Sequence, residues 1–310
     1  MKPVFIINGF LESGKTEFIN YTLAQPYFKT KGRTLLIVCE EGENEYDTNL
    51  LKATNTDMVV IEELEDFSAS KLVELDKAYK PERLIIEWNG MWDFRKCKMP
   101  FHFSVEQQIT VVDGSSFNTY FSNMRSLFAE MIKKSEMIIF NRCDSVIDEL
   151  PVFKRNIKAL NKNADVIFEG SQGEITTIFE EDLPFDLNAP VIELDNQGYG
   201  IWYIDSLDNC ERYIGKTISF TAIVARPPEF PKGYFLPGRM AMTCCADDMA
   251  FIGFACEWAG AAGLKERQWV KVTAKVAKEY FEDYKGEGPV LKAISVEPTS
   301  KPKEEVISFN

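Results

Sequence analysis

Short apolar runs and amphipathic stretches alternate along the first part of the chain. The runs are rich in valine, isoleucine and leucine and lie at residues 4–8, 33–39, 58–61, 83–88, 108–113, 136–140 and 165–168. Continuous apolar runs of this length are typical of strands buried on both faces of a sheet. Between them, apolar side chains recur at the spacing of an amphipathic helix, as in 124–136 and 152–163. This alternation predicts an α/β fold, with a mostly parallel sheet and helices on both of its sides.

The pattern changes near residue 188, after the proline-bearing connector DLPFDLNAP. From there β-rich runs prevail, and turns rich in proline and glycine separate them. These runs lie at 217–225, 239–245, 250–256, 268–281 and 289–298. Short strands at this spacing predict a small closed β-barrel, OB-like in type. We therefore expect two domains, residues 1–188 and residues 189–310.

The composition narrows the range of partners. The chain has 310 residues and a formal net charge of −13, so it lacks the basic face that nucleic acid or an anionic membrane surface requires. Its 7 cysteines are odd in number and have no framework spacing, which favours reduced thiols. No apolar run approaches a membrane span, and the N-terminal run is too short for a signal peptide. We expect a cytoplasmic protein without direct membrane insertion.

The stretch GFLESGKT follows the first apolar run and matches the phosphate-binding pattern G-x-x-x-x-G-K-T. Its glycines let the backbone N–H groups converge on one point, at the positive end of the next helix's dipole. Lys15 can reach the outer phosphates, and the Thr16 hydroxyl can hold Mg2+. A carboxylate beside phosphates is unfavourable, so we expect Glu12 to point outward. The nucleotide contacts expected from this loop are Gly9, Glu12, Ser13, Gly14, Lys15, Thr16 and Glu17.

A second motif, NRCD at residues 141–144, follows a buried run and stands where guanine-reading GTPases carry N-K-x-D. The Asp144 carboxylate can accept hydrogen bonds from guanine N1–H and N2–H2, a pair of donors that adenine lacks. Asn141 would brace the phosphate loop, and Arg142 would stack on the base in place of the usual lysine. Together the two motifs predict a GTP site.

These segments, with VCEEGENEYD, LIIEWNG and VVDGSSF, resemble the CobW family of metal-handling GTPases, relatives of UreG and HypB. The resemblance covers roughly residues 1–180 and implies that Glu87 and Gly90 contact the γ-phosphate and Mg2+. It also implies a switch loop that contains Glu40, Glu43 and Asp47. The candidates for catalysis are Lys15, Glu87, Glu40 and Glu43, and those for Mg2+ are Thr16, Glu87 and Asp47. The chain departs from the family in one feature. It has no C-x-C-C metal motif between the switch loop and the run at 83–88.

The C-terminal part, from about Tyr203, resembles the C-terminal domain of YcgQ-like proteins, which are associated with bacterial permeases. Its cysteines allow two interpretations. With a turn that brings them together, Cys244, Cys245 and Cys256 would form a soft-metal site for Zn2+. Alternatively, they are small buried residues in the core of the barrel.

The motifs and the resemblance predict a protein that binds GTP and hydrolyses it with Mg2+. The resemblance implies a role in metal homeostasis or cofactor metal handling, with a metalloprotein as the partner. An alternative of another class stays open. The protein would then be a regulatory module that binds a nucleotide, hydrolyses it only weakly and serves as the partner of a membrane permease. The absence of C-x-C-C and the arginine at position 142 favour this alternative.

Overall fold

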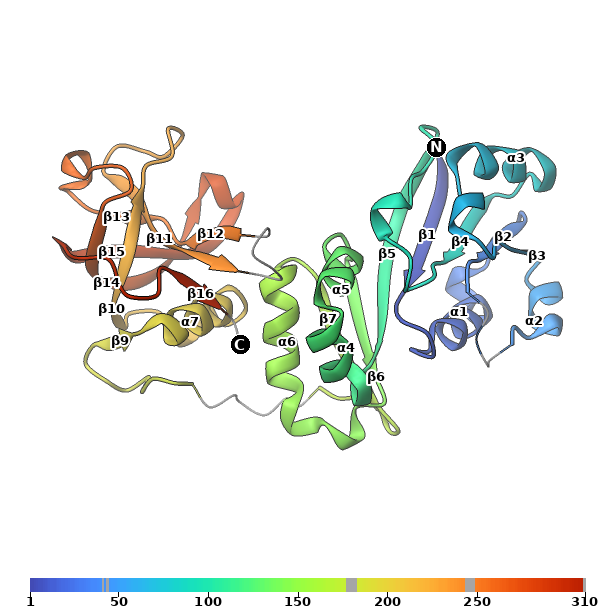
Figure 1. Ribbon diagram of the computed structural model, residues 1–310, viewed down its shortest axis with the longest axis horizontal. Coiled ribbons are helices and arrows are strands. Elements are labelled where there is room, and N and C mark those ends of the chain that lie inside the picture. Colours follow the sequence, from blue (N-terminus) through green and yellow to red (C-terminus); the bar gives the residue numbers. More distant parts are fainter. Residues whose placement is uncertain (41, 43–44, 177–182, 243–248, 309–310) are drawn as a thin grey trace. The chain divides into compact units, whose positions relative to one another are not determined.

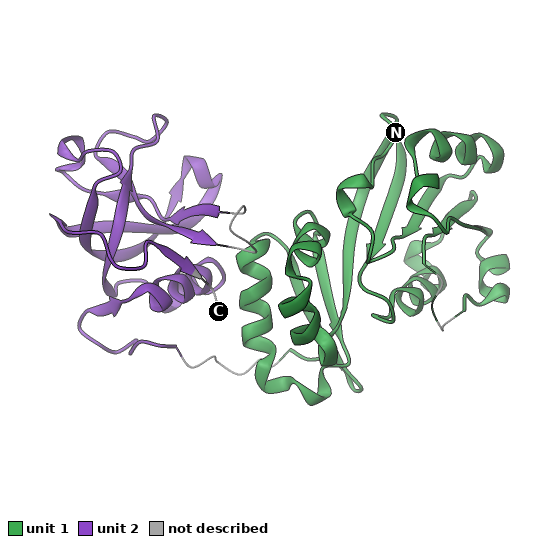
Figure 2. Ribbon diagram, in the orientation of Figure 1, with its two compact units in different colours: residues 1–179 green, residues 180–310 purple. Residues whose placement is uncertain are grey.

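The computed structural model describes residues 1–40, 42, 45–176, 183–242 and 249–308. The chain divides into two compact units, residues 1–179 and residues 180–310, and each is described by itself (Figure 2). The boundary expected from the sequence, after residue 188, lies in the irregular segment before the first strand of unit 2. Within the described residues, no helix is long and apolar enough to cross a membrane.

Unit 1 is built on a twisted, mostly parallel sheet (Figure 1). In spatial order its strands are β3 (Thr56–Val60), β2 (Thr34–Val38), β4 (Arg83–Glu87), β1 (Lys2–Asn8), β5 (Phe103–Asp113), β6 (Met137–Asn141), β7 (Asp165–Gly170) and β8 (Gly173–Glu174). Strands β1 to β7 pair in parallel, and the edge strand β8 runs antiparallel to β7. The predicted α/β fold with a mostly parallel sheet is confirmed.

Helices cover both faces of this sheet. On one face lie α1 (Lys15–Ala24) and α2 (Thr48–Ala53); on the other lie α3 (Ala69–Tyr79), α4 (Phe117–Asn123), α5 (Arg125–Ile132) and α6 (Leu150–Leu160). Neighbouring residues of a strand serve opposite faces, so that Ile6 packs on the α3 side and Ile7 on the α1 side. Both faces need apolar residues, which explains the continuous apolar runs in the sequence.

A buried polar network fixes the end of β1 from which the phosphate loop leaves. Asn8 and Thr110 face each other on β1 and β5, and both are fully buried. The Thr110 hydroxyl donates to Asn8 Oδ1 (2.5 Å) and lies 2.6 Å from Ser135 Oγ. Asn8 Nδ2 donates to the carbonyl oxygen of Met131 (3.1 Å). These bonds hold β1, β5 and the end of α5 together.

Unit 2 is rich in β-structure. Its strands are β9 (Ile192–Leu194), β10 (Thr217–Ala225), β11 (Tyr234–Met242), β12 (Met249–Gly253), β13 (Cys256–Glu257), β14 (Trp269–Phe281), β15 (Gly286–Pro298) and β16 (Val306–Ser308). Strand β10 pairs with β11 and β14, β14 pairs with β15, and β13 joins β15 to β11. These pairings form a closed cycle, whereas the OB-like type stays a prediction.

The sequence pattern missed several elements of unit 2, most clearly the helix α7 (Asn196–Asp208). Asp195 caps this helix, since its carboxylate accepts from the Gly198 N–H at 2.7 Å. Buried side chains lie along most of α7, so its apolar residues form no single stripe. The run at 250–256 is divided between β12 and β13, which pair with different parts of β11. The expected strand 239–245 ends at Met242, and its last residues lie outside the described part of the chain.

Candidate nucleotide-binding site

The phosphate loop leaves β1 at Gly9 and enters α1 at Lys15. Gly9 and Gly14 have φ angles of 144° and 97°, in the region that favours glycine. A Cβ atom on Gly9 would lie 2.2 Å from the carbonyl oxygen of Val111, and one on Gly14 would lie 2.5 Å from Asn141 Nδ2. Glycine is therefore required where the loop touches β5 and the end of β6.

The Lys15 ammonium is held within this loop. It donates to the carbonyl oxygens of Gly9 (3.0 Å) and Phe10 (2.9 Å) and forms an ion pair with Glu40 Oε2 at 2.5 Å. The side chains of Lys15 and Glu40 are 3% and 8% exposed, so little water screens their attraction. Glu40 follows β2, and the structure thus brings a predicted switch-loop carboxylate to the phosphate loop. Glu43 lies outside the described residues.

Glu87 ends β4 beside the first turn of α1. Its Oε1 accepts a hydrogen bond from the Thr16 hydroxyl at 3.1 Å, and its Oε2 accepts one from the Tyr46 hydroxyl. Burial raises the pKa of Glu87, while the bond from Tyr46 and the charge of Lys15 act in the opposite direction. The two predicted Mg2+ ligands, Thr16 and Glu87, are therefore direct neighbours.

The segments that follow β2 and β4 close tightly on the phosphate loop. A Cβ atom on Gly90 would lie 2.2 Å from the Gly9 carbonyl oxygen, so only glycine fits there without a shift of the backbone. A Cβ atom on Gly42 would lie 2.9 Å from Glu12 Oε1, which places the Glu12 carboxylate beside the segment that follows β2. The backbone of Glu12 has a φ angle of 59°, in the left-handed region that residues other than glycine seldom adopt.

Asp47 caps the helix α2. Its Oδ1 accepts from the backbone N–H groups of Asn49 (2.8 Å) and Leu50 (3.3 Å), which would otherwise lack partners in the first turn. This role differs from the metal contact that the family resemblance implies. The assignment of Asp47 to Mg2+ stays a prediction.

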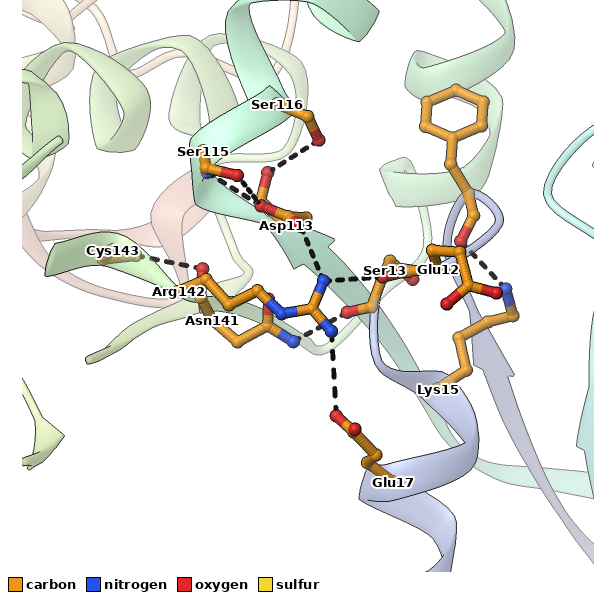
Figure 3. Close-up of polar contacts among 11 residues, drawn as sticks. Glu12, Ser13, Lys15, Glu17, Asp113, Ser115, Ser116, Asn141, Arg142 and Cys143 are labelled. Atoms are coloured by element: carbon orange, nitrogen blue, oxygen red, sulfur yellow. Dashed lines mark hydrogen bonds and ion pairs between the residues drawn. The ribbon is translucent and has the colours of Figure 1, made fainter. Parts of the chain in front are cut away.

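Asn141, at the end of β6, supports the phosphate loop from behind (Figure 3). Its Nδ2 donates to the Ser13 carbonyl oxygen at 2.7 Å. The Ser13 hydroxyl is buried and has no hydrogen-bond partner within the described residues. A buried hydroxyl of this kind is uncommon and points to a polar ligand at the loop.

Arg142 ties the same loop to β5 (Figure 3). Its Nη1 donates to the Glu12 carbonyl oxygen (2.9 Å) and pairs with Asp113 Oδ2 (2.7 Å), and its Nη2 lies 3.8 Å from a Glu17 carboxylate oxygen. Burial acts to raise the pKa of Asp113, but hydrogen bonds from Ser115 and Arg142 hold it below its usual value. Asp113 is therefore charged, and it anchors the guanidinium that the sequence assigned to base stacking.

Asp144 lies at the far end of the same edge of the sheet. Its Oδ1 and Oδ2 accept from the Ser171 N–H at 3.0 and 2.9 Å, and its Oδ1 also accepts from the Ser171 hydroxyl at 2.8 Å. These bonds lower the pKa of Asp144 and keep it ionised as a double acceptor. Its recognition of guanine stays a prediction.

The cysteines of unit 2 are only partly described. Cys256 is fully buried on β13, where it lies opposite Phe235 and Leu291. Burial raises the pKa of its thiol to about 12. Cys244 and Cys245 lie outside the described residues; elsewhere, no group of three or more His, Cys, Asp and Glu side chains could hold a metal ion. Burial of Cys256 favours the packing interpretation, and zinc binding stays a prediction.

Two polar side chains of the site escaped the sequence analysis. Tyr46 lies within the segment VCEEGENEYD, but the resemblance gives it no role; its position one residue before the N-cap of α2 places it at the end of the switch loop. Ser171 follows β7, the strand next to β6. Loops at the carboxyl ends of adjacent parallel strands meet at one edge, and this rule could have found Ser171.

Comparison with known protein families finds a match for both parts of the chain. Residues 3–168 match the nucleotide-binding domain of the CobW/HypB/UreG family, and residues 171–307 match the DUF1980 C-terminal domain. The chain is similar to zinc-regulated GTPase metalloprotein activator 1 of Dictyostelium discoideum, at 24% identity over 217 residues. That similarity covers 53% of this chain and 45% of the relative, so the chain spans less than half of the relative's length.

Similar solved structures include the Zn(II)-bound YjiA GTPase from E. coli, with 21% identity and a TM-score of 0.40 over 57% of this chain and 61% of that one. Hydrogenase maturation factor HypB from Archaeoglobus fulgidus has 16% identity and a TM-score of 0.41 over 55% and 82% of the two chains. The family match is the stronger finding, because it spans more than half of the 310 residues and includes the phosphate loop, Glu87 and Asn141. The chain therefore belongs to the CobW/HypB/UreG family, through its nucleotide-binding domain.

Proposed function

We propose that unit 1 binds GTP with Mg2+ and hydrolyses the bond between its β- and γ-phosphates. One observation carries this proposal. Lys15 and Thr16 of the phosphate loop are bonded to Glu40 after β2 and Glu87 at the end of β4. In α/β proteins, ligands bind at this carboxyl edge of the sheet. Membership of a family defined by a nucleotide-binding domain supports the same conclusion.

The side chains at this edge fit Mg2+. Thr16 and Glu87 offer a hydroxyl and a carboxylate oxygen 3.1 Å apart, and hard oxygen ligands are the ones that Mg2+ prefers. When bound, Mg2+ would neutralise charge on the β- and γ-phosphates. Lys15 would exchange its bond to Glu40 for one to phosphate, and the N–H groups of the loop would converge on the same oxygens.

Selection of guanine would come from Asp144, which follows β6 at the same carboxyl edge of the sheet. The ionised Asp144 carboxylate is exposed and presents acceptors for the two N–H groups of the guanine base. Ser171 holds this carboxylate in one orientation through its N–H and its hydroxyl. An adenine base would leave these acceptors without donors, which costs affinity.

The wider role that we propose is metal homeostasis or the delivery of metal to a metalloprotein. The family and the name of the Dictyostelium relative support this role. Unit 2, whose strand pairings close on themselves, would be an OB-like barrel that docks to the partner. Association with a permease, the alternative expected from the sequence, stays a prediction.

The proposal is tested by nucleotide binding and turnover with the full chain. Calorimetry should show Mg2+-dependent binding of GTP in preference to ATP, and phosphate release should follow with GTP. Lys15→Ala should abolish both, whereas Lys29→Ala, which changes an exposed lysine of the same unit, should leave both unchanged. Equal affinity for GTP and ATP would overturn the guanine assignment, and binding without turnover would overturn the hydrolase.

A further inference from the structure

Tyr46 is a partly buried side chain whose hydroxyl is directed at the proposed Mg2+ end of the site. It donates to Glu87 Oε2, while Thr16 donates to Oε1 of the same carboxylate. Its ring packs against the cluster that includes Val38 and Leu51. A tyrosine hydroxyl carries its proton at neutral pH, so Tyr46 is the donor of this bond and the carboxylate is the acceptor.

We infer that Tyr46 is a positioning residue for the Mg2+–nucleotide complex, which acts by fixing the orientation of the Glu87 carboxylate. This inference rests on the proposed function and extends it to a side chain outside the phosphate-loop, β4-end and guanine motifs. Glu87 is 3% exposed, so water cannot replace a missing donor at Oε2. With Oε2 held by Tyr46, Oε1 remains directed at Thr16 and at the ion that both residues would hold.

The hydroxyl and the ring of Tyr46 have separable roles. The ring contributes apolar packing, which phenylalanine would keep, whereas the hydroxyl contributes the polar contacts with Glu87 and Thr16. Partners that orient a metal-ligating carboxylate commonly change metal affinity by ten- to a hundredfold, roughly, when they are removed. Tyr46→Phe therefore isolates the orienting bond from the packing.

The position of Tyr46 also couples Glu87 to the helix α2. Tyr46 precedes Asp47, whose carboxylate caps α2 through Asn49 and Leu50. The other end of the same loop carries Glu40, the partner of Lys15. A change in the orientation of Glu87 would thus be transmitted to the start of α2 through the adjacent residues Tyr46 and Asp47.

The test titrates Mg2+ into the full chain with N-methylanthraniloyl-GTP and follows nucleotide fluorescence. For Tyr46→Phe we expect the Mg2+ concentration at half-saturation to rise about tenfold, with affinity for the nucleotide in EDTA unchanged. Tyr21→Phe removes an exposed hydroxyl of the same kind and should titrate like the wild type. Leu51→Ala removes packing from α2 but keeps the bond to Glu87; it should lower Tm without moving the Mg2+ midpoint.

The outcomes separate the inference from the proposed function. If the wild-type chain binds the GTP probe with Mg2+ but Tyr46→Phe has the same midpoint, the positioning role is wrong and the GTP site stands. If Leu51→Ala moves the midpoint as far as Tyr46→Phe does, packing rather than the hydroxyl sets Mg2+ affinity, which also overturns the inference. If the wild-type chain does not bind the probe, the proposed function fails and the inference fails with it.

Discussion

The ion pair between Lys15 and Glu40 gives a prediction with two linked readouts. Glu40→Gln keeps the size and an oxygen acceptor but removes the charge that balances the buried ammonium. Lys15 would then rely on the carbonyl oxygens of Gly9 and Phe10 and on a neutral amide. Breaking a buried pair costs about 3–5 kcal/mol, and because glutamine still accepts a hydrogen bond we expect about 2–3 kcal/mol.

This loss falls on the nucleotide-free protein. In a domain of this size, about 2–3 kcal/mol corresponds to a fall in Tm of roughly 5–10 °C. On the proposed function, Lys15 would exchange Glu40 for phosphate when GTP binds, so the same free energy should reappear as tighter binding. A difference of about 2–3 kcal/mol amounts to an affinity increase of roughly 30- to 150-fold.

Thermal unfolding without nucleotide and calorimetry with GTP and Mg2+ measure the two effects. Glu62→Gln, the same change at an exposed position of unit 1, is the matched control and should alter neither. If Glu40→Gln lowers Tm but GTP affinity stays constant, Lys15 does not leave Glu40 for phosphate. If neither quantity changes, the pair does not stabilise the nucleotide-free protein, and the reasoning is refuted.

Three further changes test other parts of the molecule. Asp144→Asn should weaken GTP binding by about a hundredfold or more and ATP binding little, whereas Asp148→Asn should leave both unchanged; calorimetry with each nucleotide distinguishes them. Thr110→Val leaves Asn8 Oδ1 without its buried donor and should lower the free energy of unfolding by about 1–3 kcal/mol in urea denaturation. Cys256→Ser should lower Tm through a buried hydroxyl without a partner, at a cost of about 1–3 kcal/mol, and added Zn2+ should not raise the wild-type Tm. Stabilisation by zinc that Cys256→Ser removes would contradict the packing interpretation.

The sequence predicted those parts of unit 1 that depend on local chemistry. Gly9 and Gly14 are required by backbone angles, and the buried strands follow from apolar runs, so both could be found without a structure. The pairing of Lys15 with Glu40 could not be found in this way, because it depends on β2 and β1 both neighbouring β4 in the sheet. The same holds for Ser171 and Asp144, which are brought together by the pairing of β6 with β7.

The helix α7 shows where pattern analysis fails. It carries Gly198 and Gly200, which lower helix propensity, and its buried residues lie around most of its circumference. Asp195 was the one available signal, since an aspartate before such a segment is typical of an N-cap. In a unit rich in strands, the β-rich sequence pattern outweighed that signal.

The charges at the phosphate loop connect nucleotide binding to the loop that runs from Glu40 to Tyr46. Lys15 supplies one buried positive charge, and Glu40 and Glu87 bring two carboxylates to it. On the proposed function, a polyanionic nucleotide would be disfavoured at this site while Lys15 remains paired with Glu40, because the phosphates would then face carboxylates without a compensating cation. Bound Mg2+ would compensate Glu87, whereas Glu40 would have to move away from the ammonium. A ligand shifts a conformational equilibrium only by its differential affinity for the two states, and the exchange of partners at Lys15 supplies that difference directly. We therefore expect binding of Mg2+–GTP to be coupled to displacement of Glu40 from Lys15.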